Sequence, residues 1–463
     1  MMRLSRRELL AGSGLTLLPA RLRAQPPSNK LNLAFIGIGT YGARCLRELA
    51  PTQNVLAVCD VDWRKRSEMN TNSLVASEVV QQYPQARRFD DWRQMLDEVD
   101  RQIDGIVIAG ADHMHAIASI ASMKRGKHVY CEKPLAHSVS EVRAMAAAER
   151  KYPVATQAGV QGHASEDCRR IVEWIRDGAI GTVKEVHLFQ TARPPDYFPG
   201  VADQQQALQR IHKRIPIPPE VKWDLWVGPA PERPYHPMYL PRKWRAWLDF
   251  GTGILGDHGP HYLDPVVWAL ELGLPQTIEA ETNPEWDPRN DRQTFPHRAT
   301  VRYTFSANAK RPALPLTWHC FDDPPVPKGW KGPLPGGGGI ISGSEGAIVF
   351  GLMYQGRPGM TVPKLVTLLP EKLDQTYRRP APSLPRPASH WLEWVDAAKR
   401  GVRGSADFAY GGLLTEICLL GDIAIRHKGS LLHFDARTKQ FLNADSANHM
   451  LASSYRSGWS LPA

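Results

Sequence analysis

Short apolar runs alternate with amphipathic segments through the first third of the chain. Residues 31–38 form a nearly continuous apolar run, which is typical of a strand buried on both faces of a parallel sheet. A helical pattern follows at 43–49, and a second apolar run covers 55–59. Further helices are expected at 89–96 and 115–125, and further strands at 105–109 and 128–131. This alternation predicts a doubly wound α/β fold with a parallel sheet.

The pattern changes beyond residue 157. Pro-rich loops at 194–219, 324–339 and 378–387 separate short β-type runs, without regular helices between them. The strands expected here are 183–191, 277–281, 298–305 and 316–319. Because crossover helices are missing from the pattern, we expect a second, α+β domain with a large, mostly antiparallel open sheet. The glycine run 336–339 is interpreted as a flexible turn, since no strand is expected to lead into it.

Three glycines connect the first expected strand to the first expected helix. In the pattern formed by Gly37, Gly39 and Gly42, the first glycine permits a tight turn, the second lets a pyrophosphate approach and the third allows close packing. Asp60 ends the next strand, where a carboxylate accepts from the ribose hydroxyls of NAD and repels the 2′-phosphate of NADP. NAD is therefore expected. NADP is the alternative, because Arg64 and Lys65 follow closely and could pair with that phosphate.

Three residues suited to acid and base chemistry occur at two places in the chain. One follows an expected strand, and two lie in an expected helix. Lys133 comes just after strand 128–131, at the carboxyl end of a parallel strand, where ligands bind in open α/β sheets. Asp257 and His261 are spaced so that a helix would place both on one face. The carboxylate would then fix the tautomer of the imidazole and favour its protonated form, which suits general acid and base catalysis on a hydroxyl. A helix-entry aspartate beside a structural histidine is the alternative.

Composition and charge narrow the function classes. The 463-residue chain has a formal net charge of +10, part of it in the first residues, and lacks the basic runs with interleaved aromatics that predict nucleic-acid binding. Its six cysteines are scattered without CxxC pairs, which argues against a disulfide scaffold. The histidines near 113 and 258 lack HExxH spacing, so no metal site is expected.

The N-terminus has the pattern of an export signal. Arg6 and Arg7 precede a short, weakly apolar stretch, which predicts a twin-arginine signal peptide over 1–24 and a periplasmic location; a basic N-terminus that stays attached is the alternative. No later run of about 18 apolar residues predicts an integral membrane segment in the mature chain. The further divisions expected are a linker at 25–30, a Rossmann domain at 31–156, a substrate and oligomerisation domain at 157–445 and a C-terminal tail at 446–463.

These motifs together resemble the Gfo/Idh/MocA family, which includes glucose-fructose oxidoreductase and inositol dehydrogenase. The resemblance rests on the glycine motif, on segments 112–115 and 132–134, and on the spacing of Asp257, Gly259 and His261. Residues 157–170 and 244–264 are similar to the exported bacterial branch of the family. The resemblance implies that Lys133 hydrogen-bonds the reacting hydroxyl, that His261 accepts its proton, and that Asp257 orients His261. It also implies a homo-oligomer, a dimer or tetramer, formed through the open sheet.

The motifs and the resemblance give two sets of candidate residues. The candidate cofactor-binding residues are Gly37, Gly39, Thr40, Tyr41, Gly42, Asp60, Arg64, Asp112, His115, Glu132 and Lys133. The candidate substrate contacts are Gln161, His163, Arg193, Trp244 and Arg245, because carbohydrate sites combine polar donors with an aromatic platform. Each substrate contact also has a structural alternative, above all Trp244, since a tryptophan in such surroundings is often part of a core.

The leading hypothesis is an NAD(P)-dependent oxidoreductase that acts on a secondary alcohol or ketone of a sugar, glycoside or cyclitol. Its cofactor is expected to be tightly bound, because the twin-arginine route carries folded proteins. One alternative is an NAD-dependent glycosidase that works by transient oxidation at C3 and elimination, with His163 or Tyr197 as an extra base. A second alternative is a catalytically silent nucleotide-binding sensor, against which the combination of Lys133, Asp257 and His261 argues.

Overall fold

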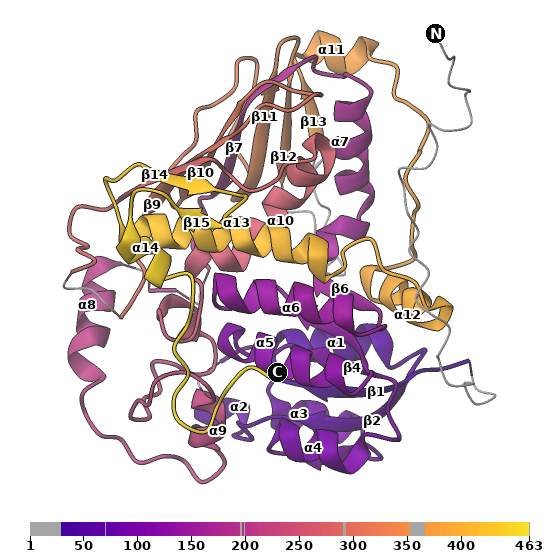
Figure 1. Cartoon of the computed structure of the whole chain (residues 1–463), viewed down its shortest axis with the longest axis vertical. Helices are drawn as coiled ribbons and strands as arrows, with labels where there is room; N and C mark the ends of the chain where they lie inside the picture. The colour runs from indigo at the N-terminus through magenta and orange to yellow at the C-terminus, as the bar shows by residue number, and fades with distance from the viewer. Residues whose placement is uncertain are drawn as a thin grey trace.

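The computed structural model describes residues 29–69, 71–194, 197–198, 200–289, 293–351 and 366–462. The expected signal peptide at 1–24 and most of the expected linker lie outside the described residues. Two β-sheets stand one above the other in Figure 1, with long helices between them.

The first sheet is parallel and has six strands in the order β3-β2-β1-β4-β5-β6. Its strands are β1 (Asn32–Ile36), β2 (Asn54–Cys59), β3 (Arg87–Phe89), β4 (Gly105–Ile108), β5 (His128–Glu132) and β6 (Thr156–Gly159). Its helices are α1 (Tyr41–Leu49), α2 (Arg66–Met69), α3 (Ala76–Val79), η2 (Val80–Gln82), α4 (Trp92–Val99), α5 (Asp112–Lys124) and α6 (Val139–Lys151). The chain changes direction between β1 and β4, which leaves a crevice at the carboxyl ends of these strands. The predicted doubly wound sheet is confirmed.

Two boundaries differ from the predicted ones. The helix expected from residue 89 begins at Trp92, because the Asp91 side chain accepts a hydrogen bond from the N–H of Arg93 and caps the helix there. Strand β6 extends past the domain boundary expected at residue 156, because its residues pair with β5 and complete the sheet.

The second sheet has nine strands in the order β13-β12-β11-β7-β10-β9-β8-β14-β15. Its strands are β7 (Val183–Gln190), β8 (Thr277–Thr282), β9 (Ala299–Phe305), β10 (Leu314–Cys320), β11 (Gly337–Gly343), β12 (Ala347–Gly351), β13 (Val366–Leu369), β14 (Leu432–Asp435) and β15 (Gln440–Phe441). Strands β7 and β10 pair in parallel, whereas the other neighbours pair antiparallel. The predicted mostly antiparallel sheet is confirmed.

The glycine run expected as a flexible turn instead enters strand β11. This strand pairs with β7 on one side and β12 on the other. A Cβ atom on Gly337 would collide with the side chains of Gln190 and Tyr262, and one on Gly339 would collide with Phe350. The turn prediction was wrong because these glycines make room for side chains that are distant in sequence.

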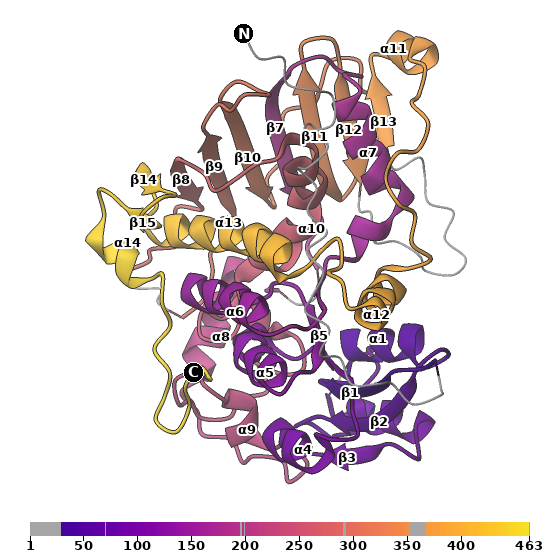
Figure 2. The ribbon, with the colours of Figure 1, turned by 45° about the vertical axis from the view of Figure 1, so that its right-hand side comes forward.

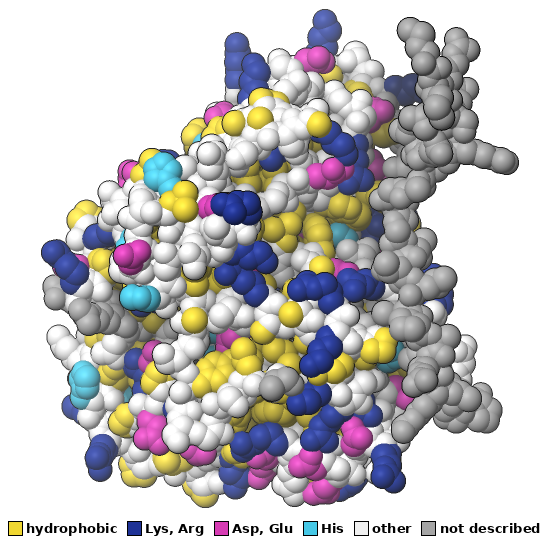
Figure 3. All heavy atoms as spheres, viewed as in Figure 1, with side chains coloured by type: hydrophobic (Ala, Val, Ile, Leu, Met, Phe, Trp, Pro, Cys, Tyr) yellow, Lys and Arg dark blue, Asp and Glu magenta, His cyan; other side chains and the backbone are white. Residues whose placement is uncertain are grey.

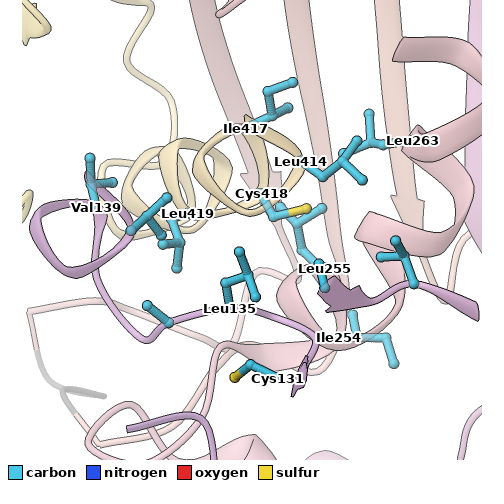
Figure 4. Close-up of a cluster of buried hydrophobic side chains, with 14 of the residues drawn as sticks. Cys131, Leu135, Val139, Ile254, Leu255, Leu263, Leu414, Ile417, Cys418 and Leu419 are labelled. Atoms are coloured by element: carbon cyan, nitrogen blue, oxygen red, sulfur yellow. The ribbon is translucent and has the colours of Figure 1, made fainter. Parts of the chain in front are cut away.

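Long helices join the two sheets. The helices of the second half are α7 (Glu166–Arg176), α8 (Val201–Arg210), α9 (Trp223–Val227), α10 (Gly253–Leu270), α11 (Glu371–Thr376), α12 (His390–Arg400), α13 (Phe408–Arg426) and α14 (Asp445–His449), with short turns η3 (Gln161–Ala164) and η4 (Lys243–Ala246). Figure 2 shows α13 running across the base of the large sheet, above α6. In Figure 4, Cys131 and Leu135 of the first domain approach Leu255 of α10 and Cys418 of α13. The two domains therefore share one apolar core.

The most apolar helix and all six cysteines lie in the interior of the protein. Helix α13 is the one described helix long and apolar enough to cross a membrane, yet most of it is buried inside the protein, as expected for a core helix. All six cysteines are buried and free.

Helix α12 covers the first sheet beside α1, where Trp394 packs against Leu33 and Gly105. A face of the Rossmann sheet is thus closed by a helix from late in the chain.

The C-terminal segment returns to the first domain. Arg456 Nη1 lies 2.6 Å from Asp224 Oδ1, and the Arg93 guanidinium lies 4.4 Å from the ring centre of Trp459. The segment expected as a tail therefore packs on the protein. On the face drawn in Figure 3, Lys and Arg side chains are spread over both domains among acidic and apolar ones.

Candidate active site

The glycine loop has the geometry that its sequence predicts. Gly37 has a φ of 75°, a left-handed conformation that favours glycine. A Cβ atom on Gly42 would collide with the carbonyl of Gly37, so helix α1 packs tightly against the turn. At Gly39 a Cβ atom would meet nothing closer than 3.7 Å, which leaves the backbone approachable. The residues therefore fit a pyrophosphate at the N-terminus of α1.

Asp60 and Arg64 lie beside this loop but have different partners. One carboxylate oxygen of Asp60 accepts from the N–H groups of Ile38 at 2.9 Å and Gly39 at 3.4 Å, and burial raises its pKa. Arg64 is buried and donates to Asp62 at 2.8 Å and 2.5 Å and to the Tyr235 hydroxyl at 3.0 Å. The guanidinium that could have paired with a 2′-phosphate is thus neutralised by a neighbouring carboxylate.

A cleft of about 1290 Å³ runs from the glycine loop to the ends of β4 and β5. Candidate cofactor residues that line it are Gly37, Gly39, Thr40, Tyr41, Asp60, Asp112, His115, Glu132 and Lys133. Trp244 and Arg245 line it too, with the Arg245 guanidinium 4.3 Å from the Trp244 ring centre. Trp459 of the C-terminal segment also contributes to the wall, a contact that no local pattern predicts. Part of this volume is open to solvent, and the cleft lies at the carboxyl ends of the parallel strands, where dinucleotides bind in such sheets.

Lys133 and Asp257 form a buried ion pair at the inner end of this cleft. Lys133 Nζ lies 2.5 Å from Asp257 Oδ1 and donates to the main-chain oxygen of Asp257 at 2.7 Å. Burial lowers the pKa of Lys133, but Asp257 and Tyr41 together raise it by more, so the lysine stays protonated. The structure therefore places an ammonium donor where β5 ends.

Asp257 is the centre of a larger charged cluster. Its other carboxylate oxygen lies 3.3 Å from the Tyr197 hydroxyl, 3.4 Å from Arg245 Nε and 3.5 Å from His258 Nε2. Burial raises the pKa of Asp257, but Lys133 and Arg245 outweigh it and hold the pKa well below its usual range. The carboxylate is therefore ionised and held from several sides.

His261 lies one helical turn beyond Asp257 on α10, as the spacing predicts. Asp257 raises the pKa of His261, as expected, but other effects outweigh it. Burial, Lys133 and His258 lower the pKa of His261 well below its ordinary value and outweigh the attraction of Asp257. The imidazole is neutral and can accept a proton. The orienting role of Asp257 stays a prediction, since the contacts given above for its carboxylate lead to other residues.

Two more carboxyl groups line the cleft, and each is buried, accepts a hydrogen bond and has a raised pKa. Burial raises the pKa of Glu132 to about 6, while one of its oxygens accepts from Gln161 Nε2 at 2.7 Å. Burial also raises the pKa of Asp112 to about 6, although the Thr252 hydroxyl donates to it at 2.8 Å. Gln161, expected to touch substrate, thus holds Glu132. Thr252 joins α10 to α5, and neither sequence pattern nor motif indicated it.

Other candidates lie away from the inner end of the cleft. His163 is buried, with Nδ1 at 2.7 Å from Asp264 Oδ1 and its ring stacked on Trp268 at 4.0 Å, so its expected substrate contact is not supported. Arg193 lines a separate cavity and lies 3.6 Å from the ring centre of Phe321. His115 Nδ1 lies 2.7 Å from the carbonyl oxygen of Pro134 and so holds the backbone next to Lys133.

Comparison with known proteins agrees with this geometry. A family model described as "Oxidoreductase family, NAD-binding Rossmann fold" matches residues 31–160, and a model described as "Oxidoreductase family, C-terminal alpha/beta domain" matches residues 205–307. Together they cover about half of the chain.

Curated relatives match over a shorter stretch. Inositol 2-dehydrogenase from Salmonella typhimurium is 28% identical over 125 residues, which are 26% of this chain and 34% of that protein. Levoglucosan dehydrogenase from Pseudarthrobacter phenanthrenivorans is 30% identical over 24% of this chain and 28% of its own length. An alpha-N-acetylgalactosaminidase from Bacteroides fragilis is 32% identical over 26% of this chain and 27% of its own length. The matches thus span about a third or less of these relatives.

Solved structures resemble the chain over most of its length. An aldose-aldose oxidoreductase from Caulobacter crescentus superposes with a TM-score of 0.55 at 17% identity, over 88% of this chain and 100% of that one. The WlbA dehydrogenase from Bordetella pertussis, solved with NADH and UDP-GlcNAcA, gives 0.55 at 15% identity, over 88% and 99%. At such identities the likeness shows the fold.

Proposed function

The chain belongs to the Gfo/Idh/MocA family of oxidoreductases, and from that premise we propose that it transfers hydride between NAD and a secondary alcohol carbon of a sugar, glycoside or cyclitol. The observation that carries the proposal is the buried pair of Lys133 and Asp257, with His261 one turn away, at the inner end of the cleft that begins at the glycine loop. The relatives named as sugar and cyclitol dehydrogenases support it.

The side chains have matched protonation states for this reaction. Lys133, protonated, donates a hydrogen bond to the oxygen of the reacting hydroxyl and stabilises the negative charge that develops there. A nitrogen of His261, neutral, accepts the hydroxyl proton while the carbon–oxygen single bond becomes a double bond. The hydrogen on that carbon leaves with its electron pair, and the bound nicotinamide supplies the acceptor. Asp257 keeps Lys133 charged throughout.

NAD is the proposed cofactor, with Gly39 and the N-terminus of α1 at its pyrophosphate and Asp60 at its ribose. The pairing of Arg64 with Asp62 supports NAD over NADP, since it withholds one of the two nearby cations, Arg64 and Lys65, from a 2′-phosphate. We further propose that the cofactor stays bound and that the protein is exported by its twin-arginine signal to the periplasm. Assembly as a dimer or tetramer stays a prediction.

An NAD-dependent glycosidase is the second candidate, because one relative is named as an alpha-N-acetylgalactosaminidase. This reaction needs a base beyond His261. Of the two bases considered, His163 is held by Asp264, whereas the Tyr197 hydroxyl stands 3.3 Å from Asp257 Oδ2 at the site. Tyr197 is therefore the proposed base in this alternative.

The test begins with the native protein. We would denature purified protein and identify released nucleotide by mass spectrometry, then add sugars and glycosides to intact protein and follow nicotinamide absorbance. Stoichiometric NAD and reduction of it by a sugar support the proposal, and net release of a free sugar from a glycoside supports the second candidate. A protein that neither contains nor binds NAD or NADP would contradict both.

A further inference from the structure

Residues 455–459 form a strap that is bound to the first domain. In Figure 1 the yellow chain after α14 runs down the molecule from the large sheet toward this domain. The Tyr455 hydroxyl donates to the carboxylate of Glu141 on α6. The Arg456 guanidinium donates to Asp224 Oδ1 at 2.6 Å and to the main-chain oxygens of Asp224 and Gly228 at 2.8 Å and 2.5 Å. Two side chains thus fix the strap at a defined place.

A turn within the strap brings Trp459 to the cofactor cleft. The N–H of Trp459 donates to the main-chain oxygen of Arg456 at 3.2 Å, and Gly458 has a φ of 84°, a left-handed conformation that favours glycine in such a turn. The Arg93 guanidinium on α4 lies 4.4 Å from the centre of the Trp459 ring, a cation–π contact. The Trp459 side chain is partly exposed and lines the cleft that also contains the glycine loop and Lys133.

The strand order shows at which end of the cleft Trp459 lies. Because the first sheet runs β3-β2-β1-β4-β5, Lys133 after β5 and the β3–α4 loop lie on opposite sides of the glycine loop. Asp91 of the β3–α4 loop lines the cleft, and Arg93, the partner of Trp459, follows two residues later. A dinucleotide with its nicotinamide at Lys133 and its ribose at Asp60, after β2, extends its adenine toward β3. Trp459 therefore lies at the adenine end.

We propose that Trp459 packs on the adenine ring of NAD and that the strap covers the adenosine end of the cofactor and slows its release. A flat indole ring suits a flat aromatic base, because the two stack on their faces. Leu225 and Trp226 of α9 line the same cleft next to Asp224, to which the strap is bound, and add apolar surface there. Since NAD is itself part of the proposed function, the strap depends on that proposal and assigns residues that retain the cofactor.

The first measurement is calorimetry of NADH and of ADP-ribose with the full-length protein, dialysed free of nucleotide. ADP-ribose contains the adenosine end of NAD and lacks the nicotinamide. Trp459→Leu should weaken both ligands by the same factor, about tenfold, because stacking is lost from the half that they share. Trp459→Phe, which keeps an aromatic ring, should retain most of the affinity. Ser460→Ala, an exposed neighbour that does not line the cleft, should bind both ligands as the wild type does.

Arg456→Met tests the strap apart from the ring. Arg456 does not line the cleft, so its removal acts through the segment that it anchors. Release of NADH, followed by fluorescence after mixing with excess NAD, should be faster than from the wild type. The double variant with Trp459→Leu should release NADH no faster than the faster single variant, because both changes remove one contact. If Trp459→Leu does not fold, the release rate of Arg456→Met decides the matter, and an unchanged rate overturns the proposal.

A fluorescent ligand separates stacking from a merely structural role of Trp459. Etheno-ADP-ribose has a fluorescent adenine, whose emission a stacked indole quenches. The probe should therefore be dimmer when bound to the wild type than when bound to Trp459→Leu. A tryptophan that only fills space would leave the emission of the bound probe unchanged. Equal affinity of Trp459→Leu and wild type, a loss confined to NADH, or unchanged emission overturns the proposal.

Failure of the proposed reaction gives a different pattern. If the protein binds NADH but no sugar reduces its NAD, the reaction is wrong, and the strap is still judged by the affinities of the variants. Sugar oxidation together with equal NADH affinity of wild type and Trp459→Leu would overturn the strap alone. A wild type that binds neither NADH nor ADP-ribose overturns both.

Discussion

Two aspartates on neighbouring helices, Asp257 on α10 and Asp422 on α13, are equally buried, yet one is ionised and the other is neutral. Each is 6% exposed. Asp257 faces Lys133 and Arg245, which hold its pKa well below the usual range despite burial. Asp422 has no hydrogen-bond partner among the described residues, and burial raises its pKa well above that range. Burial alone therefore does not set the charge of a carboxyl group, because the partner that it meets decides which state survives.

The two carboxyl groups differ in what they are free to do. Asp257 keeps the ammonium of Lys133 charged and fixed where β5 ends, which is the kind of preorganisation that the proposed catalysis requires. The carboxyl group of Asp422 has no hydrogen-bond partner among the described residues. Glu132 and Asp112 lie between these extremes, since each is buried with partial hydrogen bonding and has a pKa of about 6.

The largest effect should come from removing the positive charge of Lys133, the partner of Asp257. Lys133→Met should lower the rate of nicotinamide reduction by sugar about 10³-fold, because it removes the donor to the reacting oxygen. It also leaves Asp257 buried without its closest partner, at a cost of about 3–5 kcal/mol in the free energy of unfolding. Single-turnover absorbance and urea unfolding measure the two effects. Lys133→Arg, which keeps the charge, should recover most of the stability; a methionine variant within tenfold of wild-type activity would contradict the role.

The next effect comes from neutralising the two aspartates in parallel. Asp257→Asn should lower activity about 10²-fold and shift the alkaline limb of the pH–activity profile to lower pH, because Asp257 raises the pKa of Lys133. Asp422→Asn replaces a group that is already neutral, so its free energy of unfolding should change by less than about 1 kcal/mol. Paired pH profiles and unfolding curves test the contrast. Equal destabilisation by the two asparagines would remove the distinction.

A smaller effect concerns Glu132, whose pKa rises from 4.5 to about 6 on burial. The charged form is thus disfavoured in the folded state, and the associated stability is present below pH 4.5 and lost as pH rises through 6. Glu132→Gln should therefore exceed the wild type in unfolding free energy by at most about 2 kcal/mol at pH 8. The difference should shrink toward zero in acid. Chemical unfolding across this range measures it, and a constant difference would show that the carboxyl does not titrate as stated.

The smallest effect is expected at Thr252, whose hydroxyl donates to Asp112. Thr252→Val keeps the shape of the side chain but removes the donor, which should cost about 1 kcal/mol above the pKa of Asp112. As pH falls below 6, Asp112 becomes protonated and the cost should diminish. Thr252→Ser, which keeps the hydroxyl, is the matched control. A loss that is independent of pH would indicate a packing defect.

Much of the first domain could be predicted because its signals are local. The glycine turn, the strand ending at Cys59 and the position of Lys133 after β5 each depend on residues close together in the chain. The second domain was harder to predict. The glycines at the start of β11 do not form a turn but leave room for the side chains of Gln190 and Phe350. Its strands beyond β10 gave no pattern of their own that separated them from loops.

The sequence by itself determined the order of elements, the nucleotide loop, and the presence of a lysine, an aspartate and a histidine suited to hydride chemistry. Only the tertiary structure decided their electrostatics. Lys133 meets Asp257 across 124 positions of the chain, and Arg64 is withdrawn from the cofactor by a carboxylate and by Tyr235. Such pairings depend on which helices pack together, and a pKa follows from partners and burial. No local pattern carries that information, so the neutral His261 and the solitary Asp422 emerged from the fold.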